Sequence, residues 1–174
     1  MSQLRVPVTS QDHIQGDGDA RVVLVEYADF QCPYCRQAFS MVKQLQRRFG
    51  KDLALVFRSF PLVEVHPQAL NAAVFAEFAG TKGKFWEAHD ALFENQDLLG
   101  ADYYETLAGQ LGLSLAELQS AAAGGVLAAK VERSLEGGVR SGVNGTPTFF
   151  INGTRFDGGF DTLFRGIEEA MGGT

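Results

Sequence analysis

The chain has 174 residues, 45% of them hydrophobic and 21% charged, and it carries a formal net charge of −6. This length and composition predict one globular unit with a sizeable core. The negative net charge argues against nucleic acid or an anionic membrane surface as the main partner. No hydrophobic run approaches the ~20 residues of a transmembrane helix, so we expect no membrane span.

The N-terminus and the cysteine content bear on the compartment. Residues 1–19 are polar and lack the basic start and hydrophobic middle of a signal peptide. We therefore expect a cytoplasmic protein on the chain as given, with a periplasmic or extracytoplasmic location as the alternative if a leader was removed. The only two cysteines, Cys32 and Cys35, lie in one motif and leave none for a separate structural disulfide.

A strand–helix–strand unit is predicted in the first third of the chain. Residues 4–8 are expected to form a short strand, and 12–19 form a loop of turn-forming residues. The continuous β-branched run 21–27 is typical of a buried parallel strand. Hydrophobic residues at helical spacing over 38–49 predict a helix, and the β-rich run 52–58 predicts a second parallel strand.

The middle of the chain is rich in alanine and leucine and is predicted to be all helical. A first helix is expected from Pro67 to a stop at Gly80, and Ser114 opens a capping-box pattern for a later one. Two more are expected over 84–96 and 102–111. The last helix of this segment is marked by four residues on one face: Leu127, Val131, Leu135 and Val139.

The C-terminal part predicts a hairpin and a closing helix. Residues 146–151 and 154–157 flank Asn152-Gly153, a pair typical of tight hairpin turns. Asp161 is expected to cap the last helix. Its expected buried face consists of Leu163, Phe164, Ile167 and Ala170.

The Cys-x-x-Cys motif begins where the first parallel strand has ended and a helix starts. Pro33 suits the first helical turn, where its missing N–H is not needed. The helix N-terminus carries a partial positive charge and unpaired N–H groups, which stabilise a thiolate on Cys32. Such surroundings lower a thiol pKa from about 8.5 to roughly 3.5–7.5. Cys35 lies one turn further along, where it can attack a mixed disulfide formed at a solvent-facing Cys32.

The segments Val25-Glu-Tyr-Ala-Asp-Phe30, Cys32-Pro-Tyr-Cys35, 83–90 and 145–153 together resemble the DsbA-like branch of the thioredoxin superfamily. The resemblance implies an α/β thioredoxin fold (β-α-β, β-β-α) with an inserted all-helical domain. It places the thioredoxin-like part at 1–62 and 143–174 and the insertion at 63–142. Pro33-Tyr34 departs from the Pro-His pair of the best-known periplasmic oxidases and matches glutaredoxins, which leaves the redox potential open.

Two further sites are predicted, and the resemblance implies a role for each. Glu26 is an acid inside an otherwise hydrophobic strand, which is costly unless the acid has a partner or a task. Glu26 lies six residues before Cys32, where the family places a buried acid, and this implies a proton relay to Cys35. The alternative is a carboxylate at an exposed strand end, paired with Arg or Lys. Thr146-Pro147 resembles the family's cis-proline loop facing the disulfide. The backbone of Thr146 would pair with a bound peptide, and its hydroxyl would modulate the cysteine sulfurs.

The cysteine pair and the histidines also allow other interpretations. A Cys-x-x-Cys pair can be half a zinc site, but two more ligands are needed and the three histidines are scattered along the chain. His66 and His89 are predicted to be structural. Pro33 and Tyr34 are assigned to the substrate-binding surface. We expect no metal, and no cofactor beyond a redox-active Cys32–Cys35 disulfide.

The sequence thus predicts a thiol–disulfide oxidoreductase of the DsbA-like oxidase or isomerase type. Its expected partners are cysteine-containing proteins or peptides and an unidentified protein that resets its redox state. A glutathione-linked reductase or transferase is the alternative that the Pro33-Tyr34 pair suggests. A peptide-binding chaperone-like module with unused cysteines is the alternative from another functional class.

Overall fold

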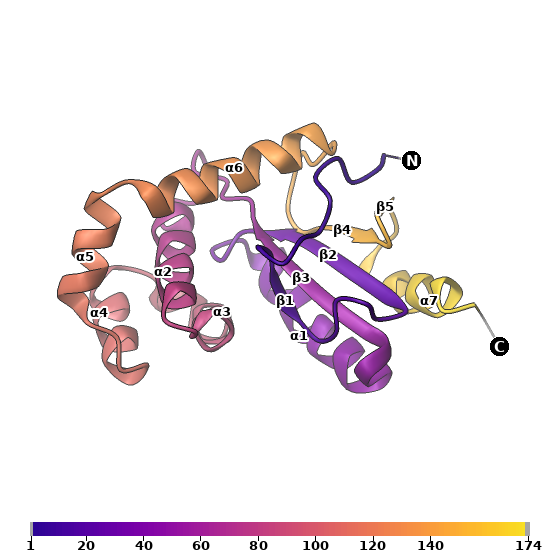
Figure 1. The fold of residues 1–174 in the computed structure, drawn as a ribbon, viewed down its shortest axis with the longest axis horizontal. Coiled ribbons are helices and arrows are strands. Elements are labelled where there is room, and N and C mark those ends of the chain that lie inside the picture. The colour runs from indigo at the N-terminus through magenta and orange to yellow at the C-terminus, as the bar shows by residue number, and fades with distance from the viewer. Residues whose placement is uncertain (1, 173–174) are drawn as a thin grey trace.

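In the computed structural model, which describes residues 2–172, a five-stranded sheet lies beside a group of helices (Figure 1). The strands are β1 (His13–Gln15), β2 (Val22–Ala28), β3 (Leu53–Ser59), β4 (Thr148–Ile151) and β5 (Thr154–Phe156). Their order in the sheet is β1-β3-β2-β4-β5, with β2 and β3 parallel and the other pairs antiparallel. This confirms the predicted β-α-β, β-β-α arrangement.

The helices divide into two groups (Figure 1). They are α1 (Pro33–Phe49), α2 (Ala69–Thr81), α3 (Phe85–Glu94), α4 (Ala101–Gln110), α5 (Leu115–Ala123), α6 (Val126–Arg140) and α7 (Phe160–Ala170). Helices α1 and α7 lie against the sheet, whereas α2 to α5 gather beyond one end of it, and α6 returns from that group toward the sheet. Short 3₁₀ turns cover Gly50–Asp52 and Gln96–Leu98. The helical segment is confirmed, while its predicted limits at 63 and 142 stay a prediction.

The sheet separates two hydrophobic clusters, because side chains alternate between its faces. On one face, Leu24 packs with Val42 of α1 and Ile167 of α7. On the other, Tyr27 and Phe150 pack together, with Leu135 of α6 against them. A third cluster fills the helical group and extends to both cysteines. Within residues 2–172, no helix is long and apolar enough to cross a membrane.

The N-terminal strand differs from its prediction. Residues 4–8 form no strand, and the edge strand is instead β1, within the segment expected to be a loop. It runs antiparallel to β3, and the His13 ring stacks on Phe85 with centroids 3.5 Å apart. These are tertiary contacts, so local residue preference gave no sign of them.

Glycines mark two departures from the predicted helices. Gly80 lies inside α2, which ends at Thr81, and a Cβ there would lie 3.1 Å from His13 Cε1. Near the end of α6, Val139 is exposed, while Gly138 faces the sheet so closely that a Cβ would lie 2.7 Å from the Phe60 ring. Glycine at each position therefore permits close packing, which hydrophobic periodicity does not reveal.

The C-terminal predictions are largely confirmed. Asn152 and Gly153 both adopt positive φ, 48° and 84°, as the predicted hairpin turn requires. In α7, Leu163 and Ile167 are buried, whereas Phe164 is partly exposed and packs on Phe49 of α1. The predicted cap is wrong: α7 begins after Gly159, and Asp161 lies within its first turn. Ala170 is exposed as well.

Candidate functional site

Both cysteines lie at the start of α1, as predicted. Cys32 is the residue that precedes the helix, Pro33 is in its first turn, and Cys35 is one turn further on. Both are free thiols. Cys32 was expected to face the solvent, but it is only 4% exposed. It is still the more accessible of the two cysteines, because Cys35 is fully buried.

The two thiols have opposite electrostatic surroundings. The Cys35 side chain hydrogen-bonds the Cys32 sulfur, and this lowers the pKa of Cys32 from 9.0 to about 5 although burial acts to raise it. The Thr146 side chain and backbone groups of Cys35 and Tyr34 lower it further. Burial, and then the adjacent Cys32, raise the pKa of Cys35 well above its ordinary value. The pair therefore consists of a ready thiolate and a protonated neighbour.

The Thr146–Pro147 loop lies directly against the first cysteine. The peptide bond between these residues is cis, as expected. The carbonyl oxygen of Thr146 is 3.6 Å from Cys32 Sγ. The Thr146 hydroxyl is buried and forms no hydrogen bond of ordinary geometry within the described residues, but its proximity acts to lower the pKa of both cysteines.

Glu26 is buried in the middle of the sheet. Glu26 is 2% exposed, and among residues 2–172 its Oε1 has no hydrogen-bond partner. Burial raises its pKa from 4.5 to about 8. This excludes the alternative of an exposed ion pair. On β2 it lies two residues after Leu24 and so on the same face of the sheet, the face that α1 covers. Its role as a proton relay stays a prediction.

Asp29 is a functional candidate that the sequence analysis did not single out. Its backbone N–H donates to Cys35 Sγ at 3.5 Å, and its side chain is fully buried. The carboxylate accepts hydrogen bonds from the N–H groups of Gln31 and Leu62 and from Nδ1 of His66. An acid directly after a buried strand was the available sequence signal.

The helical group also holds the turn that contains the cysteines. Gln96 Nε2 donates to the carbonyl oxygens of Phe30, at 2.7 Å, and Cys32, at 2.9 Å. The backbone N–H of Gln68 donates to Gln31 Oε1 at 2.6 Å. No sequence signal indicates these contacts, because the partners are distant in the chain.

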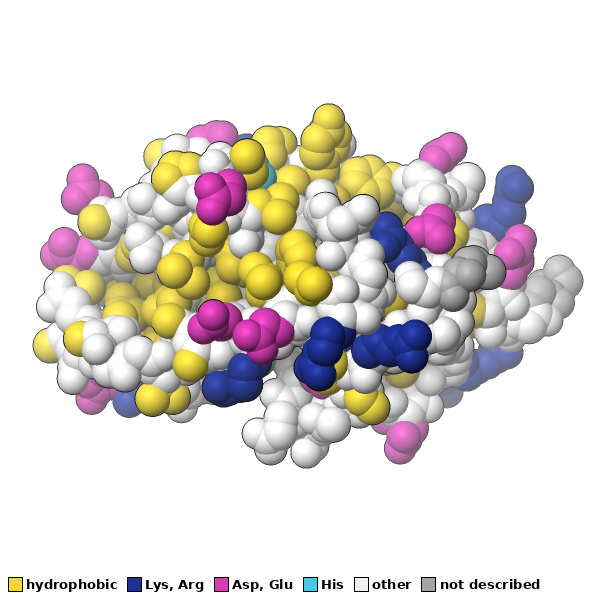
Figure 2. Space-filling model, turned by 90° about the horizontal axis from the view of Figure 1, so that it is seen from above, with side chains coloured by type: hydrophobic (Ala, Val, Ile, Leu, Met, Phe, Trp, Pro, Cys, Tyr) yellow, Lys and Arg dark blue, Asp and Glu magenta, His cyan; other side chains and the backbone are white. Residues whose placement is uncertain are grey.

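Exposed hydrophobic side chains flank this turn. The segment 62–66 is tied to it through Asp29, and Asp97 is tied to α1 through an ion pair with Arg36. The exposed large hydrophobic residues of these segments and of the motif are Tyr34, Val63, Val65 and Leu98, and Leu70 at the start of α2 is exposed too. Seen from above, hydrophobic side chains are concentrated over the helical half and Lys and Arg toward the sheet half (Figure 2).

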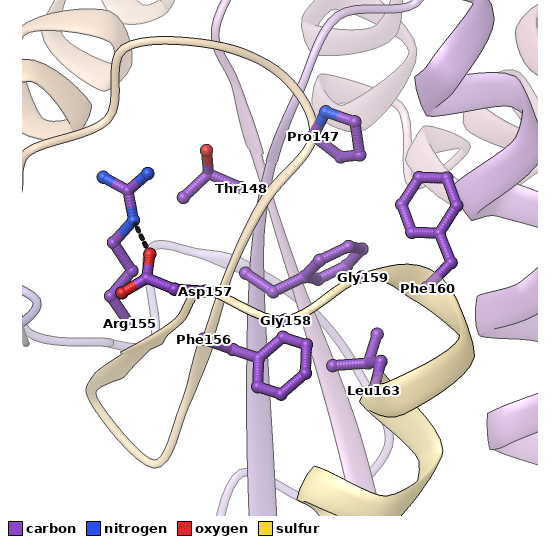
Figure 3. A pocket seen from close by; sticks show the side chains of 10 residues that line it. Pro147, Thr148, Arg155, Phe156, Asp157, Gly158, Gly159, Phe160 and Leu163 are labelled. Carbon is purple, nitrogen blue, oxygen red and sulfur yellow. Dashed lines mark ion pairs between the residues drawn. The ribbon is translucent and has the colours of Figure 1, made fainter.

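A cavity of about 180 Å³ opens beside Pro147 (Figure 3). Phe156, Phe160 and Leu163 contribute apolar walls, and the ion pair Arg155–Asp157, 2.7 Å from Nε to Oδ1, lies on another side. The cavity lies between the β4–β5 hairpin and α7. Its accessible lining is more polar than apolar, so next to the cysteine-facing loop it offers polar groups as well as aromatic rings to a bound peptide.

His89 is structural, as predicted. It is 2% exposed and lies among the rings of Phe30, Phe57 and Phe93. Burial lowers its pKa, and its Nδ1 is 2.8 Å from Asp90 Oδ1. It therefore contributes to the core that supports the active-site turn.

Comparison with curated sequences shows that this chain is similar to one part of several larger proteins. It is 40% identical over 180 residues to the Na(+)/H(+) antiporter NhaA 1 of Salinispora arenicola, covering 98% of this chain and 26% of that protein. It is 38% identical over 178 residues to NhaA of Herminiimonas arsenicoxydans, covering 98% of this chain and 28% of that protein. The chain thus spans about a quarter of the length of these relatives.

Solved structures share the fold over nearly the whole chain. BdbD from Bacillus subtilis has a TM-score of 0.85 at 22% identity, with 99% of both chains covered. Wolbachia pipientis α-DsbA1 has a TM-score of 0.82 at 19% identity, covering 97% of this chain and 94% of that one. A thioredoxin-like oxidoreductase from Silicibacter pomeroyi has a TM-score of 0.78 at 24% identity, with 95% of each covered.

A family model described as thioredoxin matches residues 8–168, which include every site residue described above. The chain therefore belongs to the thioredoxin family, and its fold, a thioredoxin sheet with an inserted helical segment, is that of the DsbA-like proteins.

Proposed function

We propose that the protein is a DsbA-like thiol–disulfide oxidoreductase that transfers its Cys32–Cys35 disulfide to cysteine pairs in other proteins or peptides. The observation that supports this direction is the lowered pKa of Cys32, about 5, beside a Cys35 whose pKa is raised. A stable thiolate leaves readily and stabilises the reduced form of the enzyme, which favours oxidation of the substrate.

In the first step, a substrate thiolate attacks Cys32 Sγ in the enzyme disulfide. The S–S bond to Cys35 breaks, a mixed disulfide forms, and the Cys35 sulfur leaves with the electron pair and takes a proton. In the second step, another substrate thiolate attacks the substrate sulfur of the mixed disulfide, and Cys32 leaves as a thiolate. The substrate loses two electrons and the cysteine pair gains two.

We assign the proton for Cys35 to Glu26. With a pKa of about 8, its carboxyl group is protonated at neutral pH, and it faces the layer formed by α1. The transfer returns a thiol at Cys35, which is the form that its buried position favours. In the reverse direction, the same carboxylate accepts the proton when Cys35 attacks a mixed disulfide.

The substrate peptide is proposed to lie extended along Thr146 and Pro147, whose loop faces Cys32. The cavity beside Pro147, whose lining combines polar groups with aromatic rings, then receives one of its side chains. Exposed Tyr34, Val63 and Val65 offer contacts that depend on apolar character rather than on a particular sequence. An enzyme that acts on many unfolded proteins needs this kind of recognition.

Net oxidation of protein thiols requires an oxidising compartment. We therefore propose the extracytoplasmic alternative for the location of the reaction. Fractionation of the source cells followed by protease treatment of intact cells or spheroplasts tests this location. A protein that is recovered only with cytoplasmic markers contradicts it.

The reduction potential tests the direction of the reaction. Equilibration with glutathione buffers, followed by alkylation of free thiols, is expected to give a value near that of DsbA, about −120 mV. A value near that of thioredoxin, about −270 mV, would identify a reductant instead. Thiolate absorbance of the reduced protein should rise with a midpoint near pH 5, and this transition should be absent in Cys32→Ser.

A glutathione-linked activity is the second candidate, because Pro33-Tyr34 is the dipeptide of glutaredoxins. Turnover of a small glutathione mixed disulfide, coupled to glutathione reductase, would support it. Rapid oxidation of a reduced, unfolded protein without such turnover supports the oxidase. A chaperone-like function independent of redox chemistry predicts that Cys32→Ser keeps full activity in suppressing aggregation.

A further inference from the structure

Asp29 joins the two cysteines through its backbone. It lies in the short turn between the end of β2 and the start of α1. Its carbonyl oxygen accepts the N–H of Cys32 at 3.1 Å, and its own N–H donates to Cys35 Sγ at 3.5 Å. A change in the backbone at this one residue would therefore move the hydrogen-bond partners of both cysteines.

The side chain of Asp29 keeps that backbone in place. Its fully buried carboxylate accepts from the N–H of Gln31 at 2.8 Å, the N–H of Leu62 at 3.0 Å and Nδ1 of His66 at 2.7 Å. A buried carboxylate is retained only where such donors replace water. Of these three donors, only His66 is a titratable side chain, and it is partly exposed.

The residue whose backbone hydrogen-bonds both cysteines thus also carries a carboxylate. A carboxylate close to a thiol disfavours the thiolate, because the two negative charges repel each other. The contact between His66 Nδ1 and the Asp29 carboxylate, 2.7 Å long, offsets that repulsion. Asp29 and His66 thus affect the stability of a thiolate at Cys32 in opposite directions.

We propose that Asp29 and His66 form a positioning pair that holds the Asp29 N–H on Cys35 and, through its charge balance, sets the redox equilibrium of Cys32 and Cys35. The inference rests on the thiol–disulfide exchange proposed above, but it does not depend on the direction of that exchange. Neither residue exchanges electrons with the substrate. Both act through the backbone and the local field.

The pair also links the redox centre to a surface. His66 and Leu62 end a short segment that contains exposed Val63 and Val65. A peptide that contacts these two valines therefore touches a segment whose ends are bonded to Asp29. The pair is thus placed between the proposed substrate contacts and the buried cysteine.

Two substitutions with opposite expected effects test the proposal. Asp29→Asn keeps the shape and an acceptor oxygen but removes the negative charge, so the equilibrium with glutathione should shift toward the reduced enzyme. His66→Gln keeps a side-chain donor but leaves the carboxylate less compensated, so the shift should be toward the disulfide. Each shift is expected to be roughly 3- to 10-fold in the equilibrium constant, as for a pKa change of up to about one unit.

The matched control is His13→Gln. His13 pairs with the buried carboxylate of Glu77 at 3.0 Å, so it belongs to the same kind of ion pair, but at the interface of β1 and α2. This variant should leave the glutathione equilibrium unchanged. In the double variant Asp29→Asn/His66→Gln, the effect of His66→Gln should disappear, because the charge that it compensates is gone.

The outcomes separate this inference from the proposed function. A wild-type protein that forms no exchangeable disulfide overturns the proposed function itself. Suppose instead that the wild-type protein exchanges normally. If Asp29→Asn and His66→Gln then shift the glutathione equilibrium equally and in the same direction, or do not shift it, the positioning pair is contradicted and the two residues serve only in packing. Should Asp29→Asn fail to fold, His66→Gln and His66→Asn still decide the question, and an unchanged equilibrium in both contradicts the proposal.

Discussion

The sheet half and the helical half of the molecule contribute to the redox site in different ways. The sheet half and α1 contain the groups that react or face the reaction: Cys32, Cys35, Glu26 and the Thr146–Pro147 loop. The helical half contributes Gln96 and Gln68, which hydrogen-bond the turn without contacting a sulfur. Reactivity thus comes from one half, and much of the positioning from the other.

The difference follows from what each task needs. The lowered pKa of Cys32 comes mainly from the side chain of Cys35 within the first turn of α1, with a smaller contribution from Thr146 in the sheet half. Holding an irregular turn requires partners for its buried carbonyl groups, and these must come from another segment. Gln96 of the helical half is such a partner, because its side-chain amide donates to two carbonyl oxygens of the turn.

Substitution of either cysteine should show which one reacts with substrate. Cys32→Ser is expected to abolish exchange, because the only thiolate near neutral pH is lost. Cys35→Ser should still form a mixed disulfide with a substrate thiol but should not resolve it. Mass spectrometry of the trapped species checks both. Accumulation of the adduct in Cys32→Ser rather than in Cys35→Ser would reverse the assigned roles.

Glu26→Gln should stabilise the fold in a pH-dependent way. The folded-state pKa of Glu26 is about 8 against an ordinary 4.5, so below pH 4.5 both states are protonated and the acid carries no penalty. As the pH rises toward 8, the unfolded state ionises first and the free energy of unfolding falls. The gain from Glu26→Gln should therefore grow to about 3 kcal/mol at pH 7.

Urea unfolding at pH 5, 7 and 8 measures this dependence. The exposed Glu105 on α4 provides the control, since Glu105→Gln should alter stability equally at each pH. A Glu26→Gln variant with the same gain at all three values would show that the buried acid is not protonated in the folded protein. That result would also remove the proposed proton source for Cys35.

Gln96→Leu tests the contribution of the helical half. The substitution leaves the carbonyl oxygens of Phe30 and Cys32 without the amide donor, which should lower the free energy of unfolding by about 2 kcal/mol. The rate of disulfide exchange should fall too, because the turn is less well held. Gln110→Leu, an exposed glutamine at the end of α4, is the control. If Gln96→Leu leaves the rate of disulfide exchange unchanged, Gln96 contributes only to the stability of the fold.

Val65→Ser should have the smallest effect. Val65 is exposed, so its loss should change the free energy of unfolding by less than about 0.5 kcal/mol. For an unfolded protein substrate, KM should rise a few-fold with kcat unchanged. Exposed Val126 at the start of α6 is the matched control. If Val65→Ser and Val126→Ser have the same KM, the segment 62–66 does not bind substrate.

Much of the reacting part was predictable from sequence. The helix after Cys32, the parallel strands and the Asn152-Gly153 hairpin each depend on patterns within a few residues. Glu26 was recognised because an acid in a hydrophobic strand is unusual. The resemblance to a known family added the cis bond before Pro147, which residue patterns alone do not indicate.

The sequence by itself determined the chemistry: a cysteine pair at a helix N-terminus, a buried acid on the central strand and a proline loop before β4. Only the tertiary structure decided that Gln96 and His66 hold the turn, and that Gly138 rather than Val139 faces the sheet. The physical reason is the range of the interactions. Helix dipoles, turns and strand patterns act between near neighbours in the chain, whereas buried carbonyls and carboxylates take their partners from whichever segment packs against them.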